Sequence, residues 1–195
     1  MAPRTREQFQ KMREKSQGKI LKSALELFSQ KGFHQTSIDA IAKYAEISKG
    51  LIYNYFDSKE EILLDIVTDG FKLIKELENF VPTSLTPKQK FDTLLTVTFN
   101  SIKENSEFWK MFFHLLSQPD VITKLSSEVD KMYSSLFKML ELHLSELGVE
   151  DVENQAKLLG AMIDGVAIHY YLNQEHYPID LMKDKVIQLY CGEEK

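Results

Sequence analysis

The sequence contains a single cysteine, Cys191, among its 195 residues. One thiol cannot form an internal disulfide, and such sparse use of cysteine is typical of a reducing compartment. The N-terminus is charged and has no apolar segment like that of a secretory signal. No apolar run approaches the roughly 18 residues that span a bilayer. We therefore expect a soluble, cytoplasmic protein without a membrane partner.

The motifs of several enzyme classes are also missing. The chain has no G-x-S-x-G, no Walker-type loop, no H-E-x-x-H and no cluster of cysteine and histidine. Asp164 lies beside Gly165 in an apolar segment, but a lone carboxylate there is more typical of a hydrogen-bonded structural group. His114 and His169 have no partner at the spacing of metal ligands. The sequence predicts no enzyme, no metal site and no cofactor.

Strand-like patterns are absent too, since no segment of any length alternates polar and apolar residues. The apolar residues instead recur at the spacing of amphipathic helices. Loop signals are confined to a few prolines and glycines, such as those at 81–87 and Gly148. We predict an all-α protein of about nine helices. Outside the segment between Gln30 and Lys59, the expected helices cover about 12–30, 59–80, 91–102, 108–116, 119–147, 151–173 and 178–190.

Charge is distributed unevenly, although the whole chain has a net charge of −5. Residues 1–60 have a balance of +4, with 11 basic and 7 acidic side chains, and the remainder has a balance of −9. A basic end on an acidic body is typical of a protein that presents one end to a polyanion. Lys15 and Lys19, near the start of the first helix, are placed to contact phosphate. Arg4 and Arg6 fit a solubilising tail equally well.

Residues 36–61 have the pattern of a helix–turn–helix. A hydroxyl of Thr36 or Ser37 can cap a helix, and Thr36 with Asp39 fits the capping-box pattern. An apolar stripe follows at helical spacing, and after a short turn Ser48 caps a second helix. The stripe consists of Ile38, Ile41, Ala42 and Ala45.

The second of these helices divides into two faces. Ile52 and Phe56 are four residues apart and pack inward. The opposite face has no acid; its side chains suit DNA, because Asn can pair with adenine, Lys with guanine or phosphate, and Tyr with phosphate or a thymine methyl. A glycine on that face allows close approach. The exposed residues are Lys49, Gly50, Tyr53 and Asn54.

A third helix begins directly afterwards, with Ser58 and Glu61 in a second capping-box pattern. Lys59 lies in its first turn, and a helix N-terminus already attracts phosphate. Two short helices and a turn also fit a plain core, but the acid-free face, the caps and the basic residues upstream together favour DNA binding. We predict contacts with DNA by Lys19, Thr36, Ser37, Ser48, Lys49, Gly50, Tyr53, Asn54, Tyr55 and Lys59.

Residues 32–64, GFHQTSIDAIAKYAEISKGLIYNYFDSKEEILL, resemble the DNA-binding region of the TetR/AcrR family of bacterial transcriptional regulators. Two positions depart from the family pattern, Asn54 where an aromatic is frequent and Tyr55 where His is frequent, which leaves the operator sequence open. The resemblance implies a helix–turn–helix domain of three helices over 1–58 and a helical domain for ligand binding and dimerisation over 59–195. The matching residues are Gly32-Phe33, Thr36-Ser37, Ile41-Ala42, Ser48-Lys49-Gly50, Ile52-Tyr53, Tyr55-Phe56 and Ser58-Lys59-Glu60-Glu61.

The C-terminal part is rich in aromatic and methionine side chains, with a few polar groups among them. This composition is typical of a small-molecule pocket, but from the residues alone each of them is explained more readily as helical core. The resemblance implies a chamber for a small hydrophobic effector here. The candidate chamber residues are Phe99, Phe108, Phe112, Phe113, His114, Met132, Tyr133, Phe137, His169 and Tyr170.

The helix expected over 151–173 is apolar on two faces, which indicates burial on both sides. The second face packs either against a partner subunit or within a monomer core. The resemblance favours the partner, because family members pair through their last two long helices. The candidate interface residues are Gly160, Ile163, Gly165, Ile168, Leu172, Met182 and Val186.

These features lead to the hypothesis of a dimeric repressor on a palindromic operator of double-stranded DNA. Each subunit would place the helix of 48–56 in the major groove, with half-sites about 34–36 Å apart. A small hydrophobic effector would favour a dimer with the wrong spacing and so lower its affinity for DNA. The alternative is a regulator whose C-terminal part serves only dimerisation or protein interaction.

Overall fold

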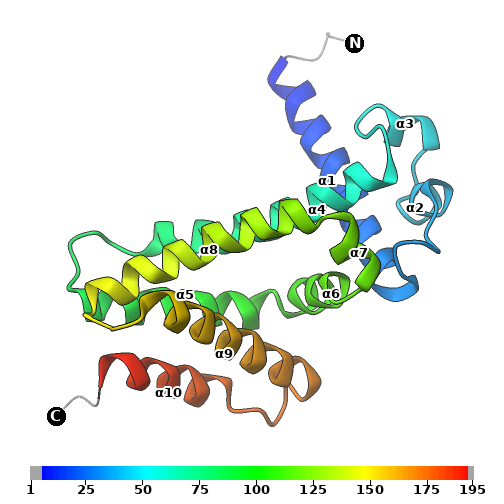
Figure 1. Ribbon diagram of the computed structural model, residues 1–195. Helices are drawn as coiled ribbons and strands as arrows, with labels where there is room; N and C mark the ends of the chain where they lie inside the picture. Colours follow the sequence, from blue (N-terminus) through cyan, green and yellow to red (C-terminus); the bar gives the residue numbers. More distant parts are fainter. Residues whose placement is uncertain (1–5, 193–195) are drawn as a thin grey trace. The chain divides into compact units, whose positions relative to one another are not determined.

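The computed structural model describes residues 6–192, with side chains from residue 13 onward. All regular elements in this range are helical, ten α-helices and one 3₁₀-helix (Figure 1), which confirms the all-α prediction. The number exceeds the expected nine because the segment expected as one helix over 119–147 forms two helices. None of the helices in the described range has both the length and the apolar character that crossing a membrane requires.

The chain forms two compact units. The first comprises the residues up to Asp69 together with 111–126, and the second comprises 70–110 and the residues from 127 onward. These units follow packing, so the functional division into 1–58 and 59–195 stays a prediction.

The first unit contains α1 (Arg6–Lys31), α2 (Ile38–Tyr44), α3 (Lys49–Tyr53) and the first half of α4 (Lys59–Glu76). It also holds the end of α6 (Ser106–Leu116) and all of α7 (Pro119–Lys124). Helix α1 begins six residues before the expected start at Met12, and Gly32 follows its end with a φ of 85°. The core of this unit is apolar and includes Ile20, Ala24, Phe28, Phe33, Ile41, Ile52, Phe56, Ile62 and Leu63.

The amide of Gln118 ties the 111–126 segment to the end of α1. Its Nε2 donates to the carbonyl of Phe28 at 3.0 Å, and its Oε1 accepts from the N–H of Phe33 at 3.2 Å. Both backbone groups lie at the end of α1, where the carbonyl of Phe28 also accepts from the N–H of Gly32 at 3.0 Å. One side chain, 85 and 90 residues further along the chain, therefore bonds to both groups.

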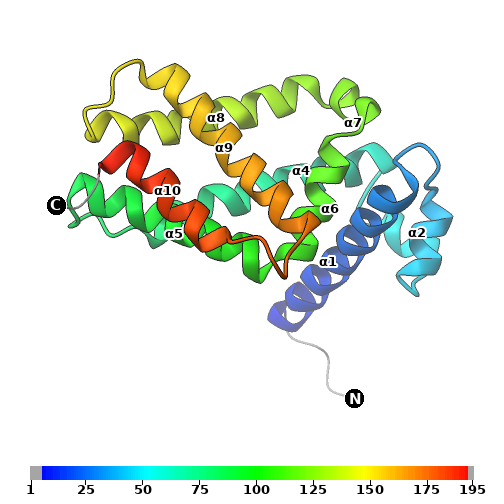
Figure 2. The same ribbon diagram turned by 90° about the horizontal axis from the view of Figure 1, so that it is seen from below.

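The second unit contains the end of α4, the 3₁₀-helix η1 (Leu77–Phe80), α5 (Pro87–Glu104), α8 (Ser126–Glu146), α9 (Val152–Leu172) and α10 (Ile179–Cys191). Thr86 and Gln89 form a complete capping box at the start of α5. Helices α8 and α9 meet at their connected ends and diverge toward their far ends (Figures 1 and 2). Helix α10 packs against α5 and α9 (Figure 2).

Candidate functional site

Helices α2 and α3 and the turn between them form the first part of the site. Ser37 is the N-cap of α2, and its hydroxyl accepts from the backbone N–H of Ala40 at 3.1 Å. Ser48 caps α3 as expected, accepting from the N–H of Leu51 at 3.2 Å. In the turn, Glu46 has a φ of 51°. This value lies in the left-handed region of the backbone, which residues other than glycine rarely adopt.

The side chains expected to contact DNA lie on the outer face of α3. Lys49, Gly50, Tyr53 and Asn54 are all exposed, and 48% of Tyr53 is accessible. A Cβ added to Gly50 would meet no atom within 4 Å, so the fold of the chain itself does not require glycine there. Ile52 on the opposite side is fully buried. The division of α3 into two faces is therefore confirmed.

Carboxylates from neighbouring helices reach this surface. Asp39 of α2 lies 3.0 Å from Nζ of Lys49, and this hydrogen bond raises the pKa of Lys49. Tyr44, also on α2, donates its hydroxyl to Oε2 of Glu26 at 2.6 Å, which raises the pKa of Tyr44. Helix α3 itself has no acid, but its cation, Lys49, is already paired with Asp39 of α2. Sequence reasoning missed both pairs.

Two residues predicted to contact DNA face inward. Thr36 is 1% exposed, and its hydroxyl donates to the carbonyl of Gly32 at 2.9 Å. Nζ of Lys59 donates to the carbonyls of Phe33 at 2.8 Å and Thr36 at 2.9 Å, and lies 4.3 Å from the Phe33 ring centroid. Burial lowers the pKa of Lys59. We therefore correct both assignments, because these side chains hold the link between α1 and α2.

The two predicted capping boxes also differ from expectation. Ser37, not Thr36, caps α2, so the box with Asp39 does not form. At α4, the hydroxyl of Ser58 accepts from the N–H of Glu61 at 3.1 Å. The carboxylate of Glu61 accepts from the N–H of Asp57 at 2.6 Å, one residue before the expected donor.

Tyr55 and Lys19 complete the predicted surface. Tyr55 is half-buried, and the guanidinium of Arg13 lies 5.7 Å from its ring centroid. This contact brings a cation of α1 next to the end of α3. Lys19 is exposed on α1. Arg4 and the side chains of Arg6 and Lys11 lie outside the described residues.

Comparison with known proteins agrees with this geometry. Residues 20–66 match the family described as bacterial regulatory proteins of the tetR family. The chain belongs to the TetR family. It is a DNA-binding transcription regulator with a helical fold, from a family that is not enzymatic.

Its relatives include regulators of fatty acid metabolism. The uncharacterized HTH-type transcriptional regulator YuxN of Bacillus subtilis (strain 168) is 38% identical over 93 residues, 47% of this chain but only 32% of that protein. The fatty acid metabolism regulator protein of the same strain is 22% identical over 179 residues, 87% of this chain and 91% of that protein. The solved structure of the transcriptional regulator FadR from Bacillus subtilis in complex with stearoyl-CoA has a TM-score of 0.70 at 24% identity. That likeness, over 91% of this chain and 98% of the other, concerns the fold.

The candidate chamber residues of this TetR-family regulator differ in burial. In the second unit, Phe99 is fully buried, whereas Phe108, Met132, Tyr133, Phe137 and Tyr170 are half-buried. In the first unit, Phe112 is buried and Phe113 is half-buried. His114 and His169 are both exposed, so neither is a polar group buried within a chamber. The ring of His169 stacks on that of Tyr177, with centroids 5.8 Å apart.

A row of aromatic rings follows the inner side of α8. Phe71 of α4 meets Tyr133 edge-on at 5.0 Å, and Tyr133 stacks on Phe137 at 5.8 Å between centroids. A Cβ on Gly160 of α9 would lie 3.0 Å from Cε1 of Phe137. Gly160 therefore admits a ring of its own chain, and we correct its assignment to the dimer interface.

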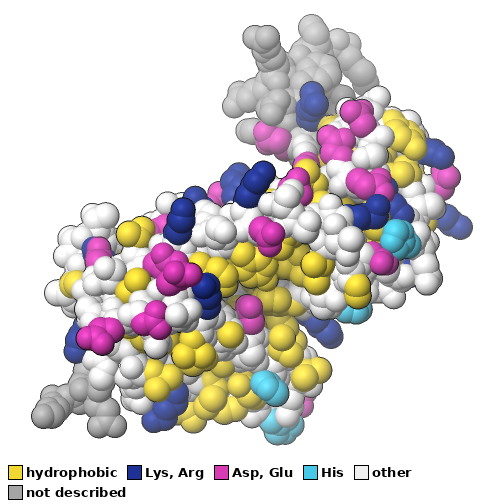
Figure 3. Space-filling model, in the orientation of Figure 1, with side chains coloured by type: hydrophobic (Ala, Val, Ile, Leu, Met, Phe, Trp, Pro, Cys, Tyr) yellow, Lys and Arg dark blue, Asp and Glu magenta, His cyan; other side chains and the backbone are white. Residues whose placement is uncertain are grey.

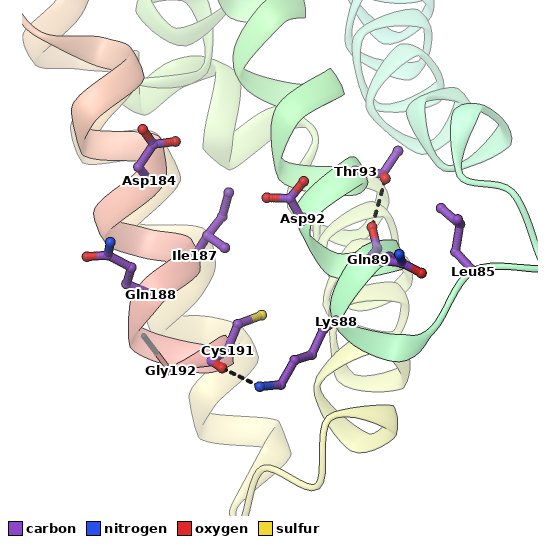
Figure 4. A pocket seen from close by; sticks show the side chains of 10 residues that line it. All are labelled: Leu85, Lys88, Gln89, Asp92, Thr93, Asp184, Ile187, Gln188, Cys191 and Gly192. Carbon is purple, nitrogen blue, oxygen red and sulfur yellow. Dashed lines mark hydrogen bonds between the residues drawn. The ribbon is translucent and has the colours of Figure 1, made fainter. Parts of the chain in front are cut away.

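A pocket of about 770 Å³ lies between α5 and α10 (Figure 4). Its lining mixes charged, polar and apolar side chains, unlike an apolar chamber. The ammonium of Lys88 donates to the carbonyl of Cys191 at 2.8 Å, and burial raises the pKa of the Cys191 thiol. Asp92 and Asp184 line the walls. Sequence reasoning did not find this pocket, because its two walls are far apart in the chain.

Helices α9 and α10 leave a set of apolar side chains exposed. Leu172 is 77% accessible, and a Cβ on Gly165 would meet no atom within 4 Å. Ile163 and Met182 are half-buried, whereas Val186 is buried within its own chain and is corrected to a core residue. The large exposed apolar residues on these two helices are Leu158, Ile168, Leu172, Leu181 and Leu189.

Proposed function

We propose that this protein is a repressor that binds a palindromic operator as a homodimer and is released by a small hydrophobic effector. The observation that carries the DNA-binding part is the outer face of α3. This face presents the phenol of Tyr53, the amide of Asn54 and the ammonium of Lys49. Gly50 lies among them with open space around it. These groups can read base edges and contact phosphate.

The exposed apolar residues of α9 and α10 support the homodimer. Five large aliphatic side chains on these helices are exposed, from Leu158 to Leu189. Contiguous apolar patches on soluble proteins are typical of interaction sites. A second copy would bury the same face on both subunits, as two-fold symmetry requires, and would give the two α3 helices a fixed spacing.

The half-buried aromatic side chains of α8 and α9 support the effector. In the second half of α8, Met139, Leu140 and Leu144 are buried in the core. In its first half, Met132 and Tyr133 are only half-buried. Figure 3 shows hydrophobic side chains gathered between α8 and α9. An apolar ligand there would cover surface that the chain alone leaves open. A relative with the same fold was solved in complex with stearoyl-CoA, which supports an acyl or alkyl chain as the hydrophobic part of the effector.

Tyr53→Ala tests the DNA-binding assignment. We expect loss of operator binding in a gel shift, with the dimer unchanged in sedimentation. Ile122→Ala is the matched control, because Ile122 of α7 is 49% exposed in the same unit and is not part of the proposed surface. Operator binding that survives Tyr53→Ala would contradict the assignment.

Leu172→Glu tests the homodimer. A carboxylate at the most exposed leucine of α9 would be desolvated in the interface, so we expect monomers and weak operator binding. Leu142→Glu, at a leucine of α8 that is 67% exposed, should leave the dimer intact. A dimer that persists in Leu172→Glu would refute this choice of interface.

A further inference from the structure

Asp164 lies in the middle of α9, one helical turn after Gly160 and on the same side of the helix. That side faces α8, because the ring of Phe137 covers Gly160. Helices α8 and α9 run in opposite directions, so Tyr133, one turn before Phe137, lies opposite Asp164. The charge of Asp164 also acts on the Tyr133 and Tyr171 hydroxyls, where it helps to raise the pKa of each.

The carboxylate of Asp164 has no hydrogen bond or ion pair with any residue between 6 and 192. Its oxygens are not sealed in the core, since they are not among the fully enclosed polar atoms without a partner. Burial nevertheless raises the pKa of Asp164 to about 6. A carboxylate in this position lacks both the solvation of the surface and the partner that a buried charge requires.

The surroundings of this carboxylate suit a cation. The stacked rings of Tyr133 and Phe137, with Phe71 edge-on, present π-electron faces and edges near it. Cations with alkyl substituents are stabilised beside such rings. The half-buried Met132 and Leu136 on the same stretch of α8 offer apolar surface for a hydrocarbon chain. A free carboxylate or phosphate in the same place would be repelled by ionised Asp164.

We propose that Asp164 binds the cationic head of an amphiphilic effector, a quaternary or protonated amine with a hydrocarbon tail. This inference rests on the proposed function and specifies the chemical class of the effector. Tyr133 and Phe137 flank the head, and the tail lies along α8. The ligand supplies the positive charge that the protein does not provide.

The proposal implies a dependence of binding on pH. A permanent cation pairs with the ionised form of Asp164, so its affinity should fall up to tenfold per pH unit below about 6 and be constant above about 7. The titratable groups facing Asp164 are Tyr133 from α8 and Tyr171 from its own helix, and neither ionises in this range.

The test compares three ligands with the same tail: decyltrimethylammonium, decanol and decanoate, each below its micelle concentration. Calorimetric titration at pH 7.5 should give an affinity for the cation at least tenfold above those for the other two. Asp164→Asn should abolish this preference while leaving the affinity for decanol unchanged. The control is Asp92→Asn, which removes the same charge from the pocket between α5 and α10 and should retain the preference.

Equal binding of the cation by wild type and Asp164→Asn would overturn the proposal, and so would its loss in Asp92→Asn, which would locate the cation in the other pocket. A gel shift with the same ligands separates this inference from the proposed function. Release of the operator by decanol or decanoate, but not by the cation, would leave the effector response standing and reject the cationic class. Failure of all three ligands to bind would reject both.

Discussion

Asp164→Asn is expected to make the folded protein more stable at neutral pH, and the gain should disappear in acid. The burial that raises the pKa of Asp164 from its ordinary 3.8 to about 6 disfavours the charged form in the folded state. In the unfolded chain the same carboxylate is hydrated. At pH 7.5 the folded wild type therefore carries an unfavourable charge that an amide of the same size does not have.

The magnitude follows from the difference between the two pKa values. A difference of about two pKa units corresponds to about 3 kcal/mol at 25 °C. Asp164 is only partly shielded from solvent, so screening should reduce the measurable effect to about 2 kcal/mol. As pH falls below 6 the folded state takes up the proton before the unfolded state does, and the wild type gains stability relative to the variant until the pH reaches about 4.

Urea unfolding monitored by circular dichroism measures this effect at pH 7.5, 6.0, 5.0 and 4.5. Protein concentration must be the same throughout, because the stability of a dimer depends on it. The free energy of unfolding of Asp164→Asn should exceed that of wild type at pH 7.5, and the excess should fall to about half or less by pH 4.5. Asp92→Asn, at an exposed carboxylate, should differ little from wild type at any pH.

A wild type as stable as Asp164→Asn at pH 7.5 would refute the burial of an unpaired charge. A difference that is constant from pH 7.5 to 4.5 would refute it as well, since only a titrating group changes its contribution with pH. Either result would also remove the electrostatic basis for a cationic ligand.

Three further predictions concern single side chains. Gly50→Ala should weaken operator binding in a gel shift without lowering the free energy of unfolding, because its Cβ meets open space in the chain. Asp39→Asn should free Lys49 to contact phosphate. In fluorescence anisotropy, the affinity for the operator at low salt should rise. The slope of log affinity against log salt concentration should steepen by up to about one unit, which corresponds to one added phosphate contact. Gly160→Ala should be less stable than Gly165→Ala by about 1–2 kcal/mol in urea unfolding, since only the Cβ at 160 meets a ring at close contact.

The caps and the two faces of α3 were predictable from sequence because their causes are local. A serine hydroxyl reaches an N–H three residues away, and the spacing of Ile52 and Phe56 fixes which side is buried. Thr36 and Lys59 were assigned wrongly for the opposite reason. Lys59 bonds to carbonyls 26 and 23 residues away, and the pattern around a lysine does not say whether it turns inward.

The second unit shows a similar limit. Helical periodicity identified α8, α9 and α10, but no proline or glycine marks the break at Leu125 that separates α7 from α8. The two glycines of α9 look alike in the sequence, yet Gly160 accommodates Phe137 and Gly165 faces open space. Which neighbour a glycine admits depends on how two helices pack, and periodicity does not contain that information.

The acids around α3 bear on how the operator is read. Lys49 and Tyr44 are held by Asp39 and Glu26 in the free protein, whereas no residue between 6 and 192 binds the side chain of Asn54. Exposed pairs of this kind are weak because water screens them, so a phosphate can displace the acids at little cost. Phosphate contacts position a protein on DNA without specifying sequence. Discrimination between operators should therefore depend on Asn54 and Tyr53, and Asn54→Ala should relax base preference more than Lys49→Ala does when both are compared on single-base operator variants.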